Sequence, residues 1–499
     1  MNSKIIRITL GMIGLIFFLF SLVILGIDIR SFRSQNTIYP AGVAVNDVSL
    51  AGLDRSAALE RLELAYSQPL ELRYKGARIQ FTPAELGFSV QYAETLDTLE
   101  SNIQTVGYWS HLWNQTSQIN VDSTLQASLN KDQLRTFLQD QIMPRYDKPA
   151  SASMPLLYTT NFQLGRSGYK LDVERAIPLI KTALLSSQER IIELPVQEAP
   201  AKPLDIRNLE IFLKQTIALE EFQGLVEIYI HDLSSEKNLH FAIMDNQPVT
   251  PDVAFSAAST IKIPIMVSTF KRSSEPTHAD IQYLLERMIV YSENPPADTL
   301  MANVIDEVRG PLIVTEDMQS LGYENTFLAG YFYLGAPVLK LYPTPANTRS
   351  DVNLDADVYN QTVASEIGDL LGLIYTCANP QAKTSQITTV FQGEVSQQEC
   401  QSILELLGAN KIGLLIEGGL PPQASIVHKH GWTPELDGLL HSMSDVGIVY
   451  TPAGDYVLAI FIYTPQQLVF DEGNWLFAKL SQTIYNAFNL EDQAYWWIE

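Results

Sequence analysis

A serine and a lysine in the second half of the chain have the spacing that nucleophilic catalysis needs. Ser259 and Lys262 lie three residues apart in an apolar segment. Residues with this spacing share one face of a helix, so we expect the hydroxyl and the amine to meet. A serine hydroxyl needs a neighbouring base, and a lysine desolvated in apolar surroundings can supply a neutral amine at neutral pH. Backbone N–H groups at the start of that helix would suit an oxyanion hole.

The same Ser-x-x-Lys spacing occurs twice more, at Ser234 and at Ser268. Ser234 falls in a predicted hairpin turn, where we expect its side chain to be solvated. Ser268 follows Ser259 by nine residues. A helix turns by roughly 900° and rises by about 13.5 Å over nine residues, which places the second serine on the opposite face. We therefore expect Ser259, and neither of the others, to face the site.

A second polar group, Ser292-Glu293-Asn294, follows an apolar helix and precedes two prolines. Alternate residues of a short extended loop point the same way, so Ser292 and Asn294 can face one cleft. The hydroxyl can relay a proton to a leaving nitrogen, and the amide can hold the substrate or Lys262.

The third group is Lys429-His430-Gly431, in a segment that is typical of a strand. Lys429 would lie on one face and attract a carboxylate, while Gly431 would let a substrate approach the backbone. His428 and His430 have the spacing of a metal-binding pair. Alternation would aim both away from Lys429, and no third ligand is evident, so we expect no metal site.

Taken in order, the three groups resemble the Ser-x-x-Lys, Ser-Asp-Asn and Lys-Thr-Gly motifs of class A β-lactamases and penicillin-binding proteins. The resemblance covers about residues 206–499. It implies a domain with an antiparallel sheet, flanking helices and a helical subdomain, and a chemistry that needs no metal or organic cofactor. The implied roles are Ser259 as acyl-accepting nucleophile, Lys262 as base, Ser292 as proton shuttle, Asn294 as positioning group, and Lys429, His430 and Gly431 as substrate-binding residues.

Two motif positions depart from that family. Glu293 replaces the usual aspartate and keeps its charge, whereas His430 replaces a threonine whose hydroxyl helps to grip the substrate carboxylate. In addition, Ser292 follows Ser259 by only 33 residues, so we expect one wall of the cleft to be reduced.

A third departure concerns the release of the acyl group. Class A β-lactamases activate water with a glutamate between the second and third motifs, a region that corresponds here to residues 326–350. This stretch contains no Asp or Glu, and the nearest carboxylates are Glu324, Asp351, Asp355 and Asp357. Loss of a general base costs roughly 10²–10⁴ in rate. We therefore predict efficient acylation followed by slow or different deacylation.

The N-terminus carries a candidate membrane anchor. Residues 8–27 contain no charge, and about 20 apolar residues suffice to cross a bilayer. Lys4 and Arg7 precede this segment, which gives a modest bias for a cytoplasmic N-terminus. No small-x-small cleavage site follows, so we expect an uncleaved single-pass anchor. Residues 1–37 would then form tail, span and stem, and the rest of the chain would be extracytoplasmic.

Two copies of Leu-Asp-x-x-x-Ala, beginning at Leu53 and Leu171, each open a helix that leads to a strand. They predict a small α+β module over residues 38–203. The stretch from Gly42 to about Pro200 resembles the YoaR-like peptidoglycan-binding module that precedes many cell-wall enzymes. Prolines near residue 200 mark a linker, and the hydrolase-like domain is expected over residues 204–499.

The amino-acid composition limits which binding partners we expect. A net charge of −23 would repel phosphate backbones, so nucleic acid is not an expected partner. Cys377 and Cys400 could be a disulfide or two buried thiols. The leading hypothesis is a membrane-anchored α+β serine hydrolase acting on β-lactams or peptidoglycan D-Ala-type amides. The alternatives are a binding protein for cell wall or β-lactam that does not turn over, and an esterase with the same serine and lysine.

Overall fold

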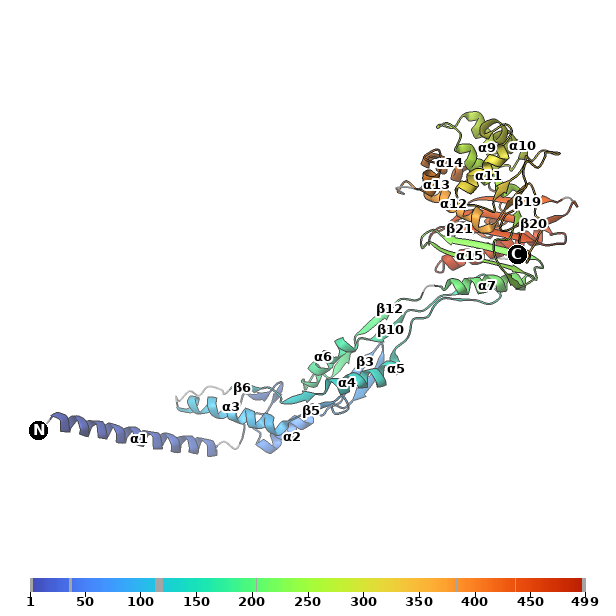
Figure 1. The fold of residues 1–499 in the computed structure, drawn as a ribbon. Helices are drawn as coiled ribbons and strands as arrows, with labels where there is room; N and C mark the ends of the chain where they lie inside the picture. Colours follow the sequence, from blue (N-terminus) through green and yellow to red (C-terminus); the bar gives the residue numbers. More distant parts are fainter. Residues whose placement is uncertain are drawn as a thin grey trace. The chain divides into compact units, whose positions relative to one another are not determined.

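The computed structural model describes residues 3–35, 38–112, 120–202, 204–381, 385–435 and 437–495. The chain forms two compact units, of which the first comprises residues 1–151 and 166–201 and the second residues 152–165 and 202–499 (Figure 1). The second unit carries the three polar groups described above.

The chain begins with helix α1 (Ser3–Gln35). Its window Met12–Arg30 is long and apolar enough to cross a membrane and is not buried by any other part of the described chain. Such a helix is consistent with a single-pass anchor or with a signal sequence.

The rest of the first unit is a small α+β assembly. Its strands are β1 (Val43–Val45), β2 (Val48–Ser49), β3 (Leu70–Tyr74), β4 (Ala77–Phe81), β5 (Phe88–Val90), β6 (Val121–Ser123), β7 (Ala127–Leu129), β10 (Gly168–Leu171), β11 (Ile191–Glu193) and β12 (Val196–Ala199). Its helices are α2 (Arg55–Tyr66), α3 (Tyr92–Leu112), α4 (Lys131–Phe137), the π-helical turn η1 (Leu138–Ile142), α5 (Met143–Tyr146) and α6 (Val173–Leu184).

The two Leu-Asp-x-x-x-Ala copies adopt the same local structure. Asp54 caps α2 by accepting from the Ala57 N–H, and Asp172 caps α6 by accepting from the Arg175 N–H. An aspartate at this position satisfies a backbone donor that the helix itself leaves free. The strands that follow the two helices, β3 and β11, pair side by side in parallel, so the repeated units share one small sheet.

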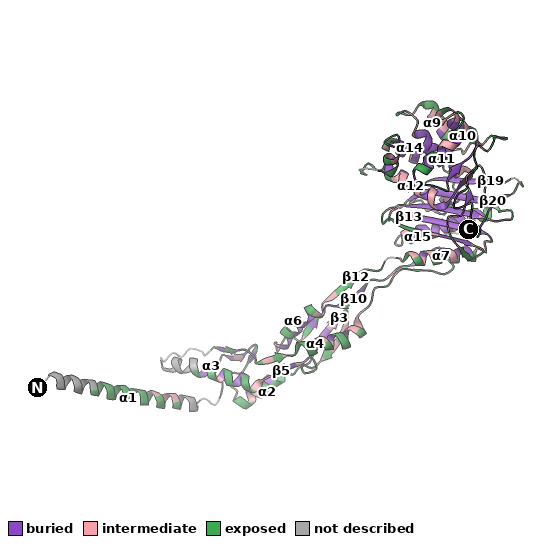
Figure 2. Ribbon diagram, in the orientation of Figure 1, coloured by how far each residue is buried: buried purple, intermediate pink, exposed green. Residues whose placement is uncertain are grey.

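A six-stranded antiparallel sheet organises the second unit, in the order β15-β14-β13-β21-β20-β19. These strands are β13 (Leu225–Asp232), β14 (Lys237–Met244), β15 (Gln247–Val249), β19 (Ser425–Pro434), β20 (Leu440–Tyr450) and β21 (Tyr456–Tyr463). The central strands are near-continuous apolar runs because both of their faces are covered, and Figure 2 shows them as buried. Strand β19, which carries the third polar group, lies at one edge.

Helices cover both faces of this sheet. In the view of Figure 1, α7 (Ile206–Leu219) and α15 (Phe470–Phe488) lie below it, and the remaining helices lie above. Those are η2 (Ala258–Ile261), α8 (Lys262–Phe270), α9 (Ala279–Ile289), α10 (Asn294–Leu300), η3 (Met301–Ile305), α11 (Gly310–Ser320), α12 (Ala364–Ala378), α13 (Gln386–Val390) and α14 (Gln397–Gly408). The short turn η4 (Glu417–Gly419) is the exception, since it packs against α15. A three-stranded sheet of β16 (Phe255–Ser256), β18 (Asn360–Thr362) and β17 (Phe327–Leu328) completes the unit. The antiparallel sheet with flanking helices and a helical part matches the expected fold.

One segment differs from the sequence-based division at residue 203. The hairpin of β8 (Met154–Pro155) and β9 (Phe162–Gln163) groups with the second unit. Phe162 is buried there, edge-on to Phe212 of α7 at 5.2 Å. Burial of this aromatic ring explains the grouping, and the prolines near residue 200 gave no sign of it.

The two cysteines form a disulfide. Cys377 near the end of α12 and Cys400 in α14 have Cα atoms 5.9 Å apart. The bond joins two helices that pack in the same hydrophobic core.

Candidate active site

Ser259 and Lys262 meet at the start of α8. Ser259 lies in the 3-10 turn η2, and α8 begins at Lys262. The α-helix therefore starts three residues after Ser259, whereas we predicted that Ser259 and Lys262 share one helix. The two side chains still lie one turn apart, with Lys262 Nζ 3.0 Å from Ser259 Oγ. Lys262 is fully buried, whereas Ser259 is half-buried and lines a cleft.

Ser292 and Asn294 bring further groups to the same amine. Lys262 Nζ donates to the Ser292 carbonyl oxygen at 2.6 Å and to Asn294 Oδ1 at 2.8 Å. Ser292 Oγ donates to Ser259 Oγ at 3.0 Å. Between these residues, Glu293 pairs with Arg287 of α9 and does not point at the amine network.

Lys429 reaches this network from β19. Its Nζ donates to Ser292 Oγ at 3.0 Å and to the His430 carbonyl oxygen at 3.2 Å. Ser292 Oγ therefore lies between the Ser259 hydroxyl on one side and a second buried amine on the other. The structure thus brings together Ser259, Lys262, Ser292, Asn294 and Lys429, which come from three distant parts of the sequence.

Burial changes the proton affinity of both lysines. Loss of solvent lowers the pKa of Lys262 to about 8, although the carboxylates of Asp298 and Glu293 act in the opposite direction. Burial, together with the charge on Lys262, lowers the pKa of Lys429 to about 7. Two amines that exchange protons near neutral pH, next to a serine hydroxyl, suit acid–base chemistry.

The backbone around Ser259 has a close approach and two unusual φ angles. A Cβ at Gly431 would lie 3.0 Å from both the Ser259 nitrogen and the Ala257 carbonyl oxygen, so a larger residue would have to push this backbone away from β19. Ala258 and Ser292 have positive φ angles of 48° and 56°. Non-glycine residues in this region carry strain, and such strain clusters at functional sites.

The two histidines beside Lys429 lie in different surroundings. His428 is buried, with Nδ1 at 2.9 Å from Asp445 Oδ1 and Nε2 at 3.0 Å from the Asn410 carbonyl oxygen. His430 stacks on Trp432 with ring centroids 4.5 Å apart and lines the cleft. Burial lowers the pKa of His430 to about 2, so this ring is neutral.

The cleft beside Ser259 has a volume of about 1000 Å³. Its walls come from the three motif regions and from the segment before β18. The lining residues are Ser256, Ala258, Ser259, Tyr291, Ser292, Asn294, Phe332, Asp355, Ala356, Asp357, Val358, Tyr359, Asn360, His430, Trp432, Thr433, Pro434, Glu435 and Asp437.

The motifs and their spacing did not predict two of the residues beside Lys262. Phe332 lies with its ring centroid 5.8 Å from Lys262 Nζ and forms part of the cleft wall. Its backbone N–H donates to Asp298 Oδ1 at 2.8 Å. Asp298 follows Asn294 by four residues, one helical turn further along α10, and this spacing was the available signal.

The four carboxylates nearest in sequence to residues 326–350 lie at different positions relative to the cleft. Asp355 and Asp357 line the cleft, whereas Asp351 pairs with Arg349. Glu324 does not line the cleft. Asp357 accepts from the Tyr359 N–H at 2.9 Å and from Asn360 Nδ2 at 2.8 Å.

The two other Ser-x-x-Lys pairs lie elsewhere. Ser268 is fully buried, and its Oγ has no hydrogen-bond partner among the described residues. Lys271 pairs with Asp317 at 2.8 Å. Ser234 lies in the turn between β13 and β14, where its hydroxyl donates to Asp232. Neither serine lines the cleft.

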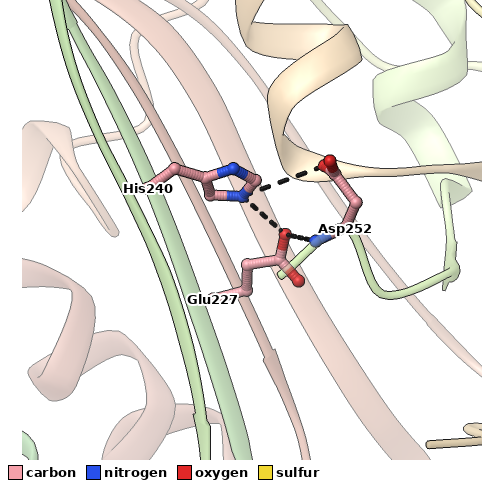
Figure 3. Close-up of side chains that lie close together, drawn as sticks. All are labelled: Glu227, His240 and Asp252. Atoms are coloured by element: carbon pink, nitrogen blue, oxygen red, sulfur yellow. Dashed lines mark hydrogen bonds and ion pairs between the residues drawn. The ribbon is translucent and has the colours of Figure 1, made fainter. Parts of the chain in front are cut away.

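A separate polar cluster anchors the chain before β16 (Figure 3). Glu227 is fully buried and accepts from His240 Nε2 at 2.9 Å and from the backbone N–H of Asp252 at 2.8 Å. Asp252 Oδ1 lies 3.9 Å from the same histidine nitrogen. Among the described residues, these three side chains have the atom types of a metal site. Their direct hydrogen bonds account for the arrangement.

Comparison with known proteins identifies the second unit in part. The model of the Beta-lactamase enzyme family matches residues 273–488, and no curated protein matches the chain. The chain thus has a β-lactamase-like C-terminal domain. The matched segment contains Ser292, Asn294 and Lys429 but begins after Ser259 and Lys262.

The solved structures to which part of the chain is similar include PBP-A and two β-lactamases. PBP-A is 20% identical over 58% of this chain and 99% of its own, with a TM-score of 0.40. A class A β-lactamase from Bacteroides cellulosilyticus is 17% identical over 56% of this chain and 97% of its own, with a TM-score of 0.39. A β-lactamase from Sphaerobacter thermophilus is 18% identical over 57% and 99%, also with a TM-score of 0.39.

Proposed function

We propose that this protein is a membrane-anchored, extracytoplasmic serine hydrolase that forms an acyl-enzyme through Ser259. Its substrates are β-lactams or peptidoglycan D-Ala-type amides, in which a carboxylate lies near the reactive amide. One observation carries the proposal: Ser259 Oγ lies 3.0 Å from both Lys262 Nζ and Ser292 Oγ at the wall of a cleft.

The contacts of Lys262 explain how it acts as the base. As a neutral amine, Lys262 has two hydrogens and one lone pair. The Ser292 carbonyl oxygen at 2.6 Å and Asn294 Oδ1 at 2.8 Å accept those two hydrogens. The lone pair then faces Ser259 Oγ at 3.0 Å and takes its proton as the oxygen attacks the amide carbonyl.

Ser292 provides the route to the leaving nitrogen. The Ser259 oxygen forms a bond to the carbonyl carbon, and the carbon–nitrogen bond breaks. Ser292 Oγ, 3.4 Å from Lys262 Nζ, takes the proton from the lysine and gives its own to the nitrogen. Lys429, in its charged form, attracts the substrate carboxylate and lies 3.0 Å from the same hydroxyl.

A specific observation favours slow release of the acyl group. Residues 326–350 contain no carboxylate, and the aromatic ring of Phe332 lies beside Lys262. If neither Asp355 nor Asp357, which line the cleft, activates water, the acyl-enzyme would form once and then persist. This supports the second candidate, a cell-wall or β-lactam binding protein that does not turn over, in which the N-terminal unit binds peptidoglycan.

Intact-mass measurement of the full-length protein after exposure to a penicillin tests the proposal. We expect a single penicilloyl adduct that is absent in Ser259→Ala. Ser268→Ala is the matched control, because its serine also precedes a lysine by three residues, and it should keep the adduct.

Three outcomes separate the hypotheses. A stable adduct supports acylation with slow release, and a transient adduct with consumption of the penicillin indicates a true β-lactamase. No adduct, or an adduct that survives Ser259→Ala, would overturn the proposed nucleophile. An esterase would then be tested with an uncharged ester substrate.

A further inference from the structure

His430 is the side chain of the third polar group that reaches the cleft. Lys429 is fully buried and does not line the cleft, whereas His430 lines it beside Trp432. The His430 ring stacks on the Trp432 ring with centroids 4.5 Å apart and an interplanar angle of 25°, which fixes its plane. What this ring offers to a substrate depends on which of its two nitrogens carries the proton.

Asn410 contacts the strand that carries this histidine. The residue comes directly after the end of α14 and is fully buried. Its Nδ2 lies 3.2 Å from the His428 carbonyl oxygen and 3.3 Å from His430 Nδ1. A carbonyl oxygen can only accept a hydrogen bond, so the amide must turn its NH₂ group, and not its oxygen, to this side. One amide hydrogen then serves the carbonyl oxygen, and the other is left for His430 Nδ1.

His428 holds the backbone of Asn410 in place. Nε2 of His428 lies 3.0 Å from the Asn410 carbonyl oxygen, and Nδ1 lies 2.9 Å from Asp445 Oδ1. Both partners are acceptors, so both nitrogens of His428 carry a proton. Although burial acts against it, the Asp445 carboxylate raises the pKa of His428. A buried ion pair thus fixes Asn410 beside β19.

The orientation of the Asn410 amide leaves one polar atom unsatisfied. With the NH₂ group turned to β19, Asn410 Oδ1 is buried and has no hydrogen-bond partner among the described residues. A buried acceptor without a donor destabilises the folded state, and an apolar side chain of similar shape would avoid this loss. The contact with His430 is a reason for an asparagine at this position.

The contact with Asn410 determines where the proton of His430 lies. A ring nitrogen that accepts a hydrogen bond carries no proton, so the proton of the neutral ring lies on Nε2. Burial lowers the pKa of His430 to about 2, which agrees with a neutral ring. No described residue accepts from His430 Nε2, and this nitrogen is not one of the buried side-chain atoms that lack a partner. Nε2 is therefore open to the cleft that the ring lines.

We propose that Asn410 is a positioning residue that holds His430 in the tautomer with its proton on Nε2, so that this N–H group donates to an acceptor on the substrate. The inference rests on the proposed acylation of Ser259 and adds a specificity determinant to it. A threonine hydroxyl, which the resemblance led us to expect at this position, can donate and accept, whereas the N–H group can only donate. The substrate group that lies here must therefore be an acceptor, such as a carboxylate oxygen.

Nitrogen NMR of the full-length protein in detergent, with isotope-labelled histidine, tests the tautomer without any substrate. The loss of two signals in His430→Phe identifies the nitrogens of this residue. In wild type, Nδ1 should have the chemical shift of an unprotonated nitrogen and Nε2 that of a protonated one. In Asn410→Asp, Nδ1 should become protonated, because a carboxylate can only accept. A protonated Nδ1 in wild type, or identical signals in both proteins, would overturn the inference.

Acylation by a penicillin, followed by intact mass, tests the role of the N–H group. His430→Phe keeps a ring on Trp432 and removes the donor, so the second-order rate at Ser259 should fall about tenfold or more. Asn410→Leu should slow acylation by about threefold, and it should have no further effect when combined with His430→Phe. His231→Phe is the matched control, because that histidine does not line the cleft, and it should leave the rate unchanged.

The outcomes distinguish this inference from the proposed function. Unchanged acylation in His430→Phe would overturn the role of the N–H group and leave the hydrolase intact. Additive effects of Asn410→Leu and His430→Phe would overturn the positioning role of Asn410 in the same way. No adduct in wild type would overturn the proposed function and the donor role together, whereas the NMR signals would still decide the tautomer.

Discussion

Two buried amines, Lys262 and Lys429, share the hydroxyl of Ser292. Burial lowers the pKa of Lys262 to about 8, and burial together with the charge on Lys262 lowers the pKa of Lys429 to about 7. The proposed mechanism needs them in opposite states, with Lys262 neutral and Lys429 charged. Because the two groups are coupled, the pair loses its protons in two macroscopic steps.

The opposite demands of the two lysines predict a bell-shaped dependence of acylation on pH. The neutral fraction of Lys262 rises as pH passes about 8, and the charged fraction of Lys429 is lost as pH passes about 7. The rate of acylation by a penicillin should therefore peak between about pH 7 and 8. In Lys429→Met the falling limb at high pH should disappear, leaving a slower reaction that only rises with pH. A falling limb that remains in this variant would refute the role of Lys429.

Buried hydroxyls give a prediction on stability. Ser268 Oγ has no partner, so Ser268→Ala removes an unsatisfied group and should raise the unfolding free energy of the second unit by about 1 kcal/mol. The control is Ser481→Ala, whose buried Oγ donates to the Ile416 carbonyl oxygen at 2.7 Å. That change should lower stability by about 1 kcal/mol. Thermal unfolding of the three proteins checks both signs, and destabilisation by Ser268→Ala would contradict the first.

At the residue scale, the spacing of residues along the sequence predicted only contacts between side chains one helical turn apart. The meeting of Ser259 with Lys262 follows from helical geometry, and the exclusion of Ser268 follows from the same geometry. Phe332 and Asp298 could not be found this way. Their contact with each other and their approach to Lys262 depend on a loop that folds back from 34 residues further along the chain.

At the scale of elements, we expect that loop to govern release of the proposed acyl group. The segment after β17 presents Phe332 to the cleft, in the region where the resemblance to class A enzymes led us to expect a glutamate, and the Phe332 N–H donates to Asp298 of α10. We predict that the penicilloyl adduct decays about 10²–10⁴ times more slowly than in an enzyme with a general base for water. The decay of intact mass with time measures this rate.

Substitution of the cleft aspartates checks the same prediction. Asp355→Asn and Asp357→Asn should each change the decay rate by less than about threefold, since general-base loss would cost roughly 10² or more. Asp351→Asn is the matched control, because Asp351 pairs with Arg349 and does not line the cleft. Rapid decay in wild type that Asp357→Asn abolishes would identify Asp357 as the base and refute the prediction.

The disulfide is a second feature at the scale of elements, and we expect it to stabilise the fold. Cys377 and Cys400 are 23 residues apart in sequence and join α12 to α14. Closing a loop of this length stabilises a fold by about 3 kcal/mol in the chain-entropy model. Cys377→Ala/Cys400→Ala should therefore lower the midpoint of unfolding in denaturant, and a reducing agent should have the same effect on wild type only. Equal stability of the two proteins would contradict this.

The elements themselves were largely predictable. The hairpin of β13 and β14, the edge strand with Lys429 and the helix over 206–219 follow from apolar periodicity and turn residues. The pairing of the cysteines and the placement of the β8–β9 hairpin were not predictable. Both depend on contacts between segments far apart in sequence, for which a single sequence holds no distance information.

At the scale of the whole molecule, the first unit, the second unit and helix α1 each have a predicted role that can be tested separately. The charge of −23 would repel phosphate backbones, so we expect no nucleic-acid partner. The prediction of a peptidoglycan-binding role for residues 38–203 can be tested by sedimentation of the protein with purified cell wall.

Helix α1 predicts where the protein resides. The window Met12–Arg30 spans about 28 Å as a helix, close to the roughly 30 Å of a bilayer core. The full-length protein should therefore stay with the membrane fraction after washing with concentrated salt, which removes proteins held by charge alone. A chain that begins at Ile38 should be released and should still be acylated on Ser259, because the cleft lies wholly within the second unit. A soluble wild-type protein whose intact mass lacks α1 would instead identify that helix as a cleaved signal sequence.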